Sequence, residues 1–358
     1  MTKPDSPVQL LHPGMPKAAS TWLQNAFFAG HPALAVLAPE DGSADLASRF
    51  VAAIEKLVLG SDLQDVAAVG AELADLARQR AARNPGARIV GLSHEALAGA
   101  WPTPRNSGFL ARTMGGLFPG AKVLLVVREH RAALVSHWRE FVRMGGTLSF
   151  RRFLFDPALG GDPVVHPLHT AVLGTVLVAP IVRAWREACG ADGVLVLPFE
   201  RLQRDPQGFA RAICAFLGVD EFAPPPVRAN VQLSAAALGL LRRCNHLFHT
   251  RRHPRFGWHP VARVLSWGGA PKGDAWRDAR ANPWYVRYRI SDYCQRWLAK
   301  RCMPVLDRCG LAAFGQGGDP FARLAAERRA YLATQFAADT AALRGLVDWD
   351  PGEFGYSG

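Results

Sequence analysis

The sequence has few of the residues that hold small secreted or metal-bound proteins together. Six cysteines occur in 358 residues. None of them forms a C-x-x-C pair, and no spacing of cysteine and histidine fits a zinc site. This excludes a disulfide framework and predicts a reducing compartment, so we expect a cytoplasmic protein that needs no metal.

Long hydrophobic runs are also missing. The longest, TAVLGTVLVAP over 170–180, is too short to span a bilayer and ends at Pro180. We expect it to lie in a buried helix over 166–189. The first residues, MTKPDSPVQLL, lack a charged segment followed by an apolar run, so no signal peptide is predicted.

The sequence has fewer acidic than basic residues. The 30 Asp and Glu face 42 Lys and Arg, for a net charge of +12. Such a charge favours anionic partners: phosphorylated or sulfated ligands, polyanions or an anionic membrane surface. The alternative is an arginine-rich surface with no partner. We expect no nucleic-acid partner, because no recognition module is apparent.

Apolar runs that read as strands alternate with helical patterns in the first 220 residues. Strands are predicted at 8–11, 87–93, 121–128 and 193–199, and helices at 20–28, 43–59, 62–84, 131–143, 166–189 and 206–218. The alternation predicts an α/β fold, a P-loop-like three-layer α/β/α core with a mainly parallel sheet. We assign residues 1–235 to this core.

The composition changes after the core, so we assign 236–358 to a C-terminal extension packed on it. Residues 236–301 hold fourteen Lys and Arg, three Asp and five Trp, and 319–347 reads as a helical tail. The tryptophans and arginines could bind an acidic or sugar-containing acceptor, or touch a membrane surface. Equally, the tryptophans could pack a small helical layer while the arginines face solvent.

The stretch HPGMPKAASTW, residues 12–22, joins the first predicted strand to the first helix. It is not a Walker A loop, because Lys17 precedes Ser20 by three residues and the second glycine is missing. Free N–H groups at the start of a helix still favour an anion there, and Lys17 adds charge. Ala19 stands in this turn, and we expect its φ to be negative, since a Cβ disfavours positive φ.

A second group of polar residues follows the strand at 121–128. Arg128 stands at the carboxyl end of the strand, where open α/β sheets bind ligands. Ser136 comes eight residues later, about two helical turns on. The two side chains can therefore converge on one anionic group.

Together these motifs resemble those of the sulfotransferases that use 3′-phosphoadenosine-5′-phosphosulfate (PAPS), bacterial members included. PKAASTWL (16–23) is similar to the family's donor-binding loop, and Arg128 with Ser136 to its second signature. LPFERLQRDPQGFARAICAFLG (197–218) supports the match. One departure is Ala19, where the family usually has glycine.

The resemblance implies roles for these residues. Lys17 would contact the phosphosulfate and neutralise the leaving oxygen. Ala18, Ala19, Ser20 and Thr21 would hold the 5′-phosphate, and Arg128 and Ser136 the 3′-phosphate. Trp22 and Phe199 would lie near the adenine, with plain core packing as the alternative.

A general base is expected at the end of the second predicted strand, in GLSHEALAG (91–99). His94 resembles the histidine of small-molecule sulfotransferases. Glu95 resembles the glutamate of carbohydrate and protein-tyrosine sulfotransferases. Because the two residues are adjacent, only one is expected to point into the site, and Glu95 is the first choice.

The sequence therefore predicts transfer of a sulfuryl group from PAPS to a hydroxyl or amine of a small-molecule, carbohydrate or lipid acceptor. Two alternatives stay open. One is a nucleotide-dependent kinase with a degenerate P-loop, and the other is a non-catalytic protein that binds polyanions or membranes. The acceptor and the oligomeric state are not encoded in any motif.

Overall fold

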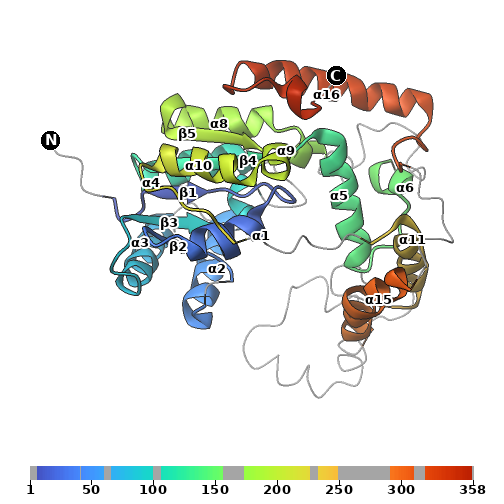
Figure 1. Cartoon of the computed structure of the whole chain (residues 1–358), viewed down its shortest axis with the longest axis horizontal. Helices are drawn as coiled ribbons and strands as arrows, with labels where there is room; N and C mark the ends of the chain where they lie inside the picture. The colour runs from blue at the N-terminus through green and yellow to red at the C-terminus, as the bar shows by residue number, and fades with distance from the viewer. Residues whose placement is uncertain are drawn as a thin grey trace. The chain divides into compact units, whose positions relative to one another are not determined.

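A computed structural model describes residues 6–40, 42–59, 66–99, 106–155, 173–225, 233–248, 291–309 and 319–356. Five parallel strands form one sheet in the order β2-β3-β1-β4-β5, with β1 in the centre (Figure 1). The strands are β1 (Leu10–His12), β2 (Leu34–Leu37), β3 (Ile89–Ser93), β4 (Lys122–Val127) and β5 (Val194–Pro198). The predicted α/β class and parallel sheet are confirmed.

The central strand is paired on both sides. Leu10 aligns with Gly91 of β3 and with Lys122 of β4. In β4 every residue from Val123 to Val127 is buried. Since successive side chains of a strand point to opposite faces, helices must cover both faces of the sheet there.

The helices of the sheet unit agree with most of the predicted segments. They are α1 (Ser20–Trp22), continued by η1 (Leu23–Phe28), then α2 (Ala44–Leu59), α3 (Val66–Ala82), η3 (Glu95–Ala98), α4 (Ser107–Leu117), α8 (Ala179–Cys189), η6 (Ala191–Gly193), α9 (Phe199–Arg204), α10 (Pro206–Leu217), α16 (Ala326–Arg344) and η10 (Pro351–Phe354). Neither β2 nor α4 was predicted from the sequence patterns. β2 has only four residues, so its apolar run is too short to stand out.

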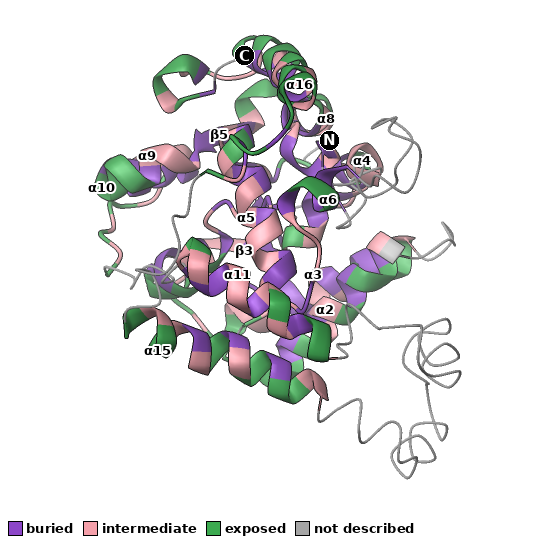
Figure 2. Cartoon of the chain, turned by 90° about the vertical axis from the view of Figure 1, so that its right-hand side faces the viewer, coloured by how far each residue is buried: buried purple, intermediate pink, exposed green. Residues whose placement is uncertain are grey.

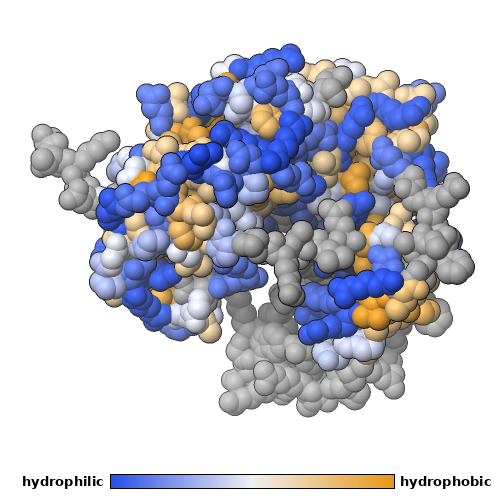
Figure 3. Space-filling view, viewed as in Figure 1, coloured by the Kyte–Doolittle hydropathy of each residue, from blue (hydrophilic) through white to orange (hydrophobic). Residues whose placement is uncertain are grey.

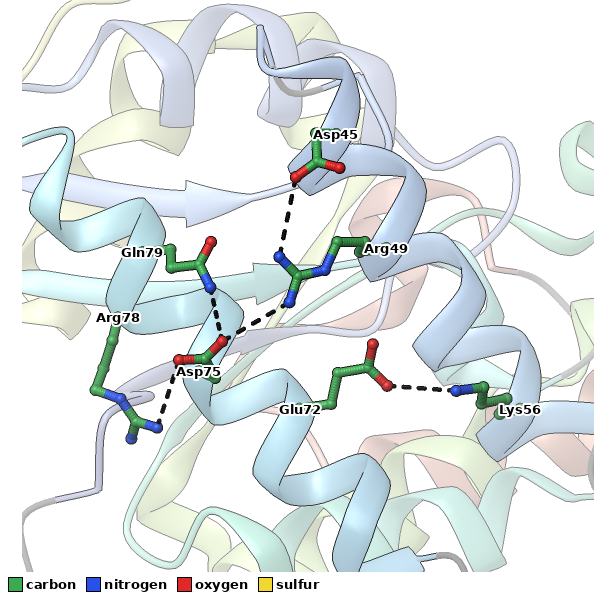
Figure 4. Close-up of polar contacts among 7 residues, drawn as sticks. All are labelled: Asp45, Arg49, Lys56, Glu72, Asp75, Arg78 and Gln79. Atoms are coloured by element: carbon green, nitrogen blue, oxygen red, sulfur yellow. Dashed lines mark hydrogen bonds and ion pairs between the residues drawn. The ribbon is translucent and has the colours of Figure 1, made fainter.

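Helices α2 and α3 pack side by side, and their outer edge carries ion pairs (Figure 4). Arg49 of α2 lies between Asp45 and Asp75, and Lys56 lies 3.4 Å from Glu72. These pairs are exposed, so each stabilises the fold by less than about 1 kcal/mol.

One predicted helix is wrong in its extent. The sequence indicated a single helix over 166–189, of which 166–172 lie outside the described residues. In the described part, a helical turn at 173–176 ends and α8 starts anew at Ala179, with Pro180 in its first turn. Proline has no N–H and is favoured in a first turn, so it begins this helix and does not continue the previous one.

Contacts within the chain divide it into two compact units. The first contains 1–134, 162–228 and 325–358, and therefore includes both the sheet and α16. The second contains 135–161 and 229–324. Helix α5 (His130–Arg143) begins in the first unit and continues into the second. Our division of the chain at residue 235 stays a prediction.

The second unit is helical in its described part. Its elements are the greater part of α5, α6 (Phe150–Leu154), α11 (Ala235–Cys244), η7 (Asn245–Leu247), η8 (Leu298–Cys302) and α15 (Met303–Arg308). Buried Asn245 donates to the carbonyls of Val142 and Gly146 and accepts from Gln295. This amide network joins the helices, because buried polar groups require partners.

The described surface is mostly hydrophilic on the face seen in Figure 3, where hydrophobic residues form small groups. None of the described helices combines the length and the apolar character that crossing a bilayer requires. In Figure 2, α16 shows exposed residues along one side and buried residues on the other. Its buried residues are Leu332, Phe336, Asp339, Thr340 and Leu343, at the spacing of one helix face.

Candidate functional site

The turn between β1 and α1 is built around a glycine. A Cβ placed on Gly14 would lie 2.6 Å from Ser20 Oγ, 3.2 Å from His12 Cε1 and 3.4 Å from Glu95 Cγ. A side chain at Gly14 would therefore collide with Ser20, so the turn requires glycine there. The same distances place the side chain of Glu95, one of the two base candidates, next to the turn.

Two residues of this turn have left-handed backbone conformations. Lys17 has φ 67° and Ala19 has φ 68°. Our expectation of a negative φ at Ala19 is wrong. The turn takes the conformation that suits the glycine found at this position in the resembling family, and the alanine adopts it at a cost of roughly 1–2 kcal/mol.

We expect Ala19→Gly to stabilise the protein. Relief of the left-handed conformation outweighs the extra freedom that glycine brings to the unfolded chain, for a net gain of about 0.5 kcal/mol. Ala68→Gly, on the exposed face of α3, is the control and should lower stability by about 1 kcal/mol. Urea unfolding of both variants measures the difference, and equal losses of stability would contradict the strain at Ala19.

Arg128 brings the two sequence motifs together. Its Nη1 donates to the carbonyl oxygen of Lys17 at 2.9 Å, across 111 residues of sequence. Its guanidinium also lies over the ring of Phe199, 4.7 Å from the centroid. Both contacts orient the planar fork of an arginine beside the turn, where it can take up an anion.

The start of α5 is fixed by two carboxylates. Glu129 accepts from the N–H groups of Arg131 and Ala132, which caps the helix. Glu200 Oε1 accepts from the N–H of Glu129 at 3.1 Å. Burial raises the pKa of Glu200, while this hydrogen bond and the charge of Arg128 act in the opposite direction.

The two base candidates lie differently. His94 is the N-cap of η3, where its Nδ1 accepts from the N–H of Ala96 at 3.0 Å, and its ring packs against Phe50. Burial lowers the pKa of His94 to about 4. Glu95 is exposed, and its side chain reaches toward Gly14. The two candidates therefore differ in exposure, and the choice of Glu95 as the base stays a prediction.

A buried polar network lies behind these residues. Nδ1 of His12, at the end of β1, lies 2.7 Å from the Oγ of Ser93, at the end of β3. Gln24 Nε2 donates to the same oxygen at 2.9 Å. Burial lowers the pKa of His12 to about 3, so its ring is neutral at ordinary pH. The network links β1, β3 and η1 directly below the turn.

The remaining predicted site residues are distributed as follows. The N–H of Ala18 donates to the carbonyl of Met15 at 3.2 Å, Ser20 is buried and Thr21 is exposed. Trp22 is partly buried against Phe27 and Phe209. These contacts agree with the core-packing alternative for Trp22 and leave part of its ring open.

Ser136 lies on α5 within the second unit, half-buried. Its role in 3′-phosphate binding therefore stays a prediction from sequence spacing. Most of the basic, tryptophan-rich region, residues 249–290, lies outside the described residues, so its predicted roles stay open. Within the described part of the chain no group of three or more His, Cys, Asp and Glu is arranged to hold a metal ion.

Sequence reasoning missed several residues that shape this site. Gly14, His12, Gln24 and Glu200 were part of quoted motifs or their neighbours, yet carried no predicted role. Gly14 had a signal: a glycine between a strand end and a lysine-containing turn. No sequence signal pointed to the hydrogen-bond partners of His12 and Glu200, because hydrogen bonds between distant segments leave no local pattern.

The site and fold can now be compared with known proteins. A model of the sulfotransferase family matches residues 13–224. A sulfotransferase from Alicyclobacillus acidocaldarius is 20% identical, with a TM-score of 0.44 over 75% of this chain and 98% of that one. A search of curated proteins gives no significant match.

Two further solved structures are similar. One is the sulfotransferase domain from the curacin biosynthetic pathway, 18% identical with a TM-score of 0.36 over 61% of this chain and 76% of that one. The other is the sulfotransferase domain of the Synechococcus PCC 7002 olefin synthase, 21% identical with a TM-score of 0.35 over 60% and 74%. Because the family model covers more than half of the chain and includes the turn, Glu95 and Arg128, the chain belongs to the sulfotransferase family.

Proposed function

We propose that this sulfotransferase uses PAPS as donor and a hydroxyl or amine of a small-molecule, carbohydrate or lipid molecule as acceptor. The observation that carries the proposal is the hydrogen bond from Arg128 to the carbonyl of Lys17. It joins the two motifs that the resemblance assigns to the two phosphate ends of one donor. The net charge of +12 agrees with a polyanionic ligand.

The turn fits the 5′ end of such a donor. Gly14 leaves the loop without a side chain beside Ser20, and the first N–H groups of α1 have no carbonyl in a preceding helical turn. An anion there is stabilised by these N–H groups and by the hydroxyls of Ser20 and Thr21. Lys17 supplies the positive charge for the oxygen that leaves.

Arg128 fits the 3′ end. Its guanidinium is placed beside the turn by the hydrogen bond to Lys17 and the contact with Phe199, and an arginine side chain can bind a phosphate through two parallel hydrogen bonds. Ser136 is the second 3′-phosphate ligand in the proposal, on the strength of its spacing alone. Phe199 and the open part of Trp22 are the proposed contacts of the adenine.

The donor supplies an activated sulfuryl group, which passes in line to the acceptor oxygen or nitrogen. The protein positions the two molecules and balances charge, as in phosphoryl transfer. Glu95 takes the proton from the acceptor as its oxygen or nitrogen bonds to sulfur, while Lys17 stabilises the phosphate oxygen whose bond to sulfur breaks. No residue of the protein is required to form a covalent intermediate.

The proposal predicts a large loss of donor affinity in Arg128→Ala. We expect the dissociation constant of adenosine 3′,5′-bisphosphate, measured by titration calorimetry, to rise about 30-fold, because a charge-assisted pair worth roughly 2 kcal/mol is removed. The control is Arg49→Ala, which removes an exposed arginine of α2. Absence of binding to the native protein, or equal affinities of the two variants, would refute the proposed donor.

The acceptor class requires a transfer assay. Donor carrying ³⁵S in its sulfuryl group is incubated with panels of phenols, sugars, glycolipids and amines, and labelled products are separated from free sulfate. Transfer to one class identifies the acceptor. Label that appears only as free sulfate in all panels would contradict transfer to these acceptors.

A further inference from the structure

The C-terminal helix α16 reaches the start of α5 through one buried carboxylate. Asp339 Oδ2 lies 2.9 Å from His130 Nε2, and both side chains are buried, at 4% and 0% exposure. A carboxylate accepts hydrogen bonds, so the Nε2 of His130 carries the proton. His130 follows Arg128 by two residues, at the first position of α5.

Asp339 has two further partners on α8. The N–H of Val178 donates to Oδ2 at 3.0 Å, and the N–H of Ala179 donates to Oδ1 at 3.1 Å. These are the amides exposed by the helix break before Pro180. A buried carboxylate with three donors is well satisfied, which makes it a rigid anchor between α16, α8 and α5.

The ring of His130 also packs against two aromatic side chains of the C-terminal segment. It stacks on Phe336, one helical turn before Asp339, with centroids 4.9 Å apart and planes within 7°. Tyr356, near the end of the chain, packs edge-on against it at 5.4 Å. Residues of the C-terminal segment 336–356 therefore pack around the ring of His130 and fix its orientation.

The contacts of His130 lie two residues from Arg128, in the same turn of chain. Glu200 of α9 accepts a hydrogen bond from the N–H of Glu129, and Asp339 of α16 accepts one from the next residue, His130. The turn from Arg128 to His130 is thus fixed by two carboxylates from separate parts of the chain. A shift of His130 moves the backbone from which the guanidinium of Arg128 projects.

We propose that Asp339 is a positioning residue for donor binding, which acts through His130 to place Arg128 for the donor's 3′-phosphate. The inference rests on the proposed function of Arg128. It makes Asp339, 209 residues from His130 in sequence, part of the support of the donor site. Its action is on binding of the 3′-phosphate and not on the chemistry of transfer.

The test compares two ligands that differ only in the 3′-phosphate. In Asp339→Asn, the amide NH₂ cannot accept from the donors around it, so we expect adenosine 3′,5′-bisphosphate to bind about tenfold more weakly, or roughly 1.4 kcal/mol. Affinity for adenosine 5′-monophosphate should stay within about twofold. Calorimetry on the full-length chain gives both constants.

Two further variants keep the test decisive. His130→Phe keeps an aromatic ring against Phe336 and removes the N–H that donates to Asp339. If Asp339→Asn does not fold, the two affinities are measured on His130→Phe instead. Leu343→Ala removes a buried residue of the same helix that has no contact role with His130 in this proposal. It should lower the melting temperature while the ratio of the two affinities stays native.

The outcomes separate the inference from the proposed function. A loss confined to the 3′,5′-bisphosphate in Asp339→Asn or His130→Phe supports the inference. If the native protein prefers the bisphosphate and these variants keep that preference, or weaken both ligands equally, the inference is overturned and the proposed function stands. If the native protein does not distinguish the two ligands, the proposed role of Arg128 fails, and the inference fails with it.

Discussion

Lys17→Met should lower the rate of sulfuryl transfer at saturating donor by at least about 100-fold. The lysine is the cation of the turn, and removal of one group that stabilises charge in the transition state typically costs this much. Methionine is unbranched and nearly as long as lysine, and it lacks the charged ammonium group. Single-turnover transfer of ³⁵S from the donor, with the best acceptor of the panel, measures the effect.

The control for this substitution is Lys56→Met. Lys56 lies on α2, exposed, and pairs with Glu72 at 3.4 Å (Figure 4). Its replacement changes the net charge of the protein by the same amount, so any general effect of charge on donor attraction appears in both variants. Equal rates for the Lys17 and Lys56 variants would show that Lys17 does not act on the leaving oxygen.

Glu95→Gln should lower the transfer rate by at least about 100-fold, as expected for loss of a general base. His94→Asn should retain the native rate within about threefold, because asparagine is a good N-cap and can accept from the N–H of Ala96 in place of the imidazole. Transfer assays on both variants decide between the two adjacent candidates. Glu72→Gln, an exposed carboxylate on α3, is the control.

The pH dependence of transfer tests the buried state of His94, and the two substitutions separate the candidates. Burial lowers the pKa of His94 to about 4, so the imidazole is neutral from pH 5 upward. Because His94 is already neutral at these pH values, we expect no inflection of the rate near pH 6.5, the ordinary pKa of histidine, whichever of the two residues is the base. A collapse of activity in His94→Asn, with native activity in Glu95→Gln, would assign the base to His94 instead.

Local patterns predicted those features that depend on short stretches of chain. The apolar run at 121–128 predicted β4 because a buried parallel strand needs apolar residues on both faces. The motif PKAASTWL and the pair Arg128–Ser136 predicted an anion site, since a strand end, a turn and a helix start already define where N–H groups point. The family then followed from these motifs, and the match over residues 13–224 confirms it.

The backbone of the turn could not be predicted in the same way. An alanine favours negative φ, yet Ala19 has φ 68°, because the geometry of the whole turn outweighs the preference of one residue. The break in the helix before α8 was likewise not predicted from the sequence. The helix predicted over 166–189 passes through Pro180, whereas in the structure a new helix begins at Ala179 and the carboxylate of Asp339 accepts from the N–H groups of Val178 and Ala179.

The sequence by itself determined the fold class, the family and the short motifs, because each depends on residue types at fixed local spacing. Only the tertiary structure decided that Arg128 bonds to the carbonyl of Lys17, that Glu95 rather than His94 borders Gly14, and that Asp339 holds His130. These contacts join segments between 81 and 209 residues apart. They depend on how strands and helices pack in space, and no pattern in a single segment encodes them.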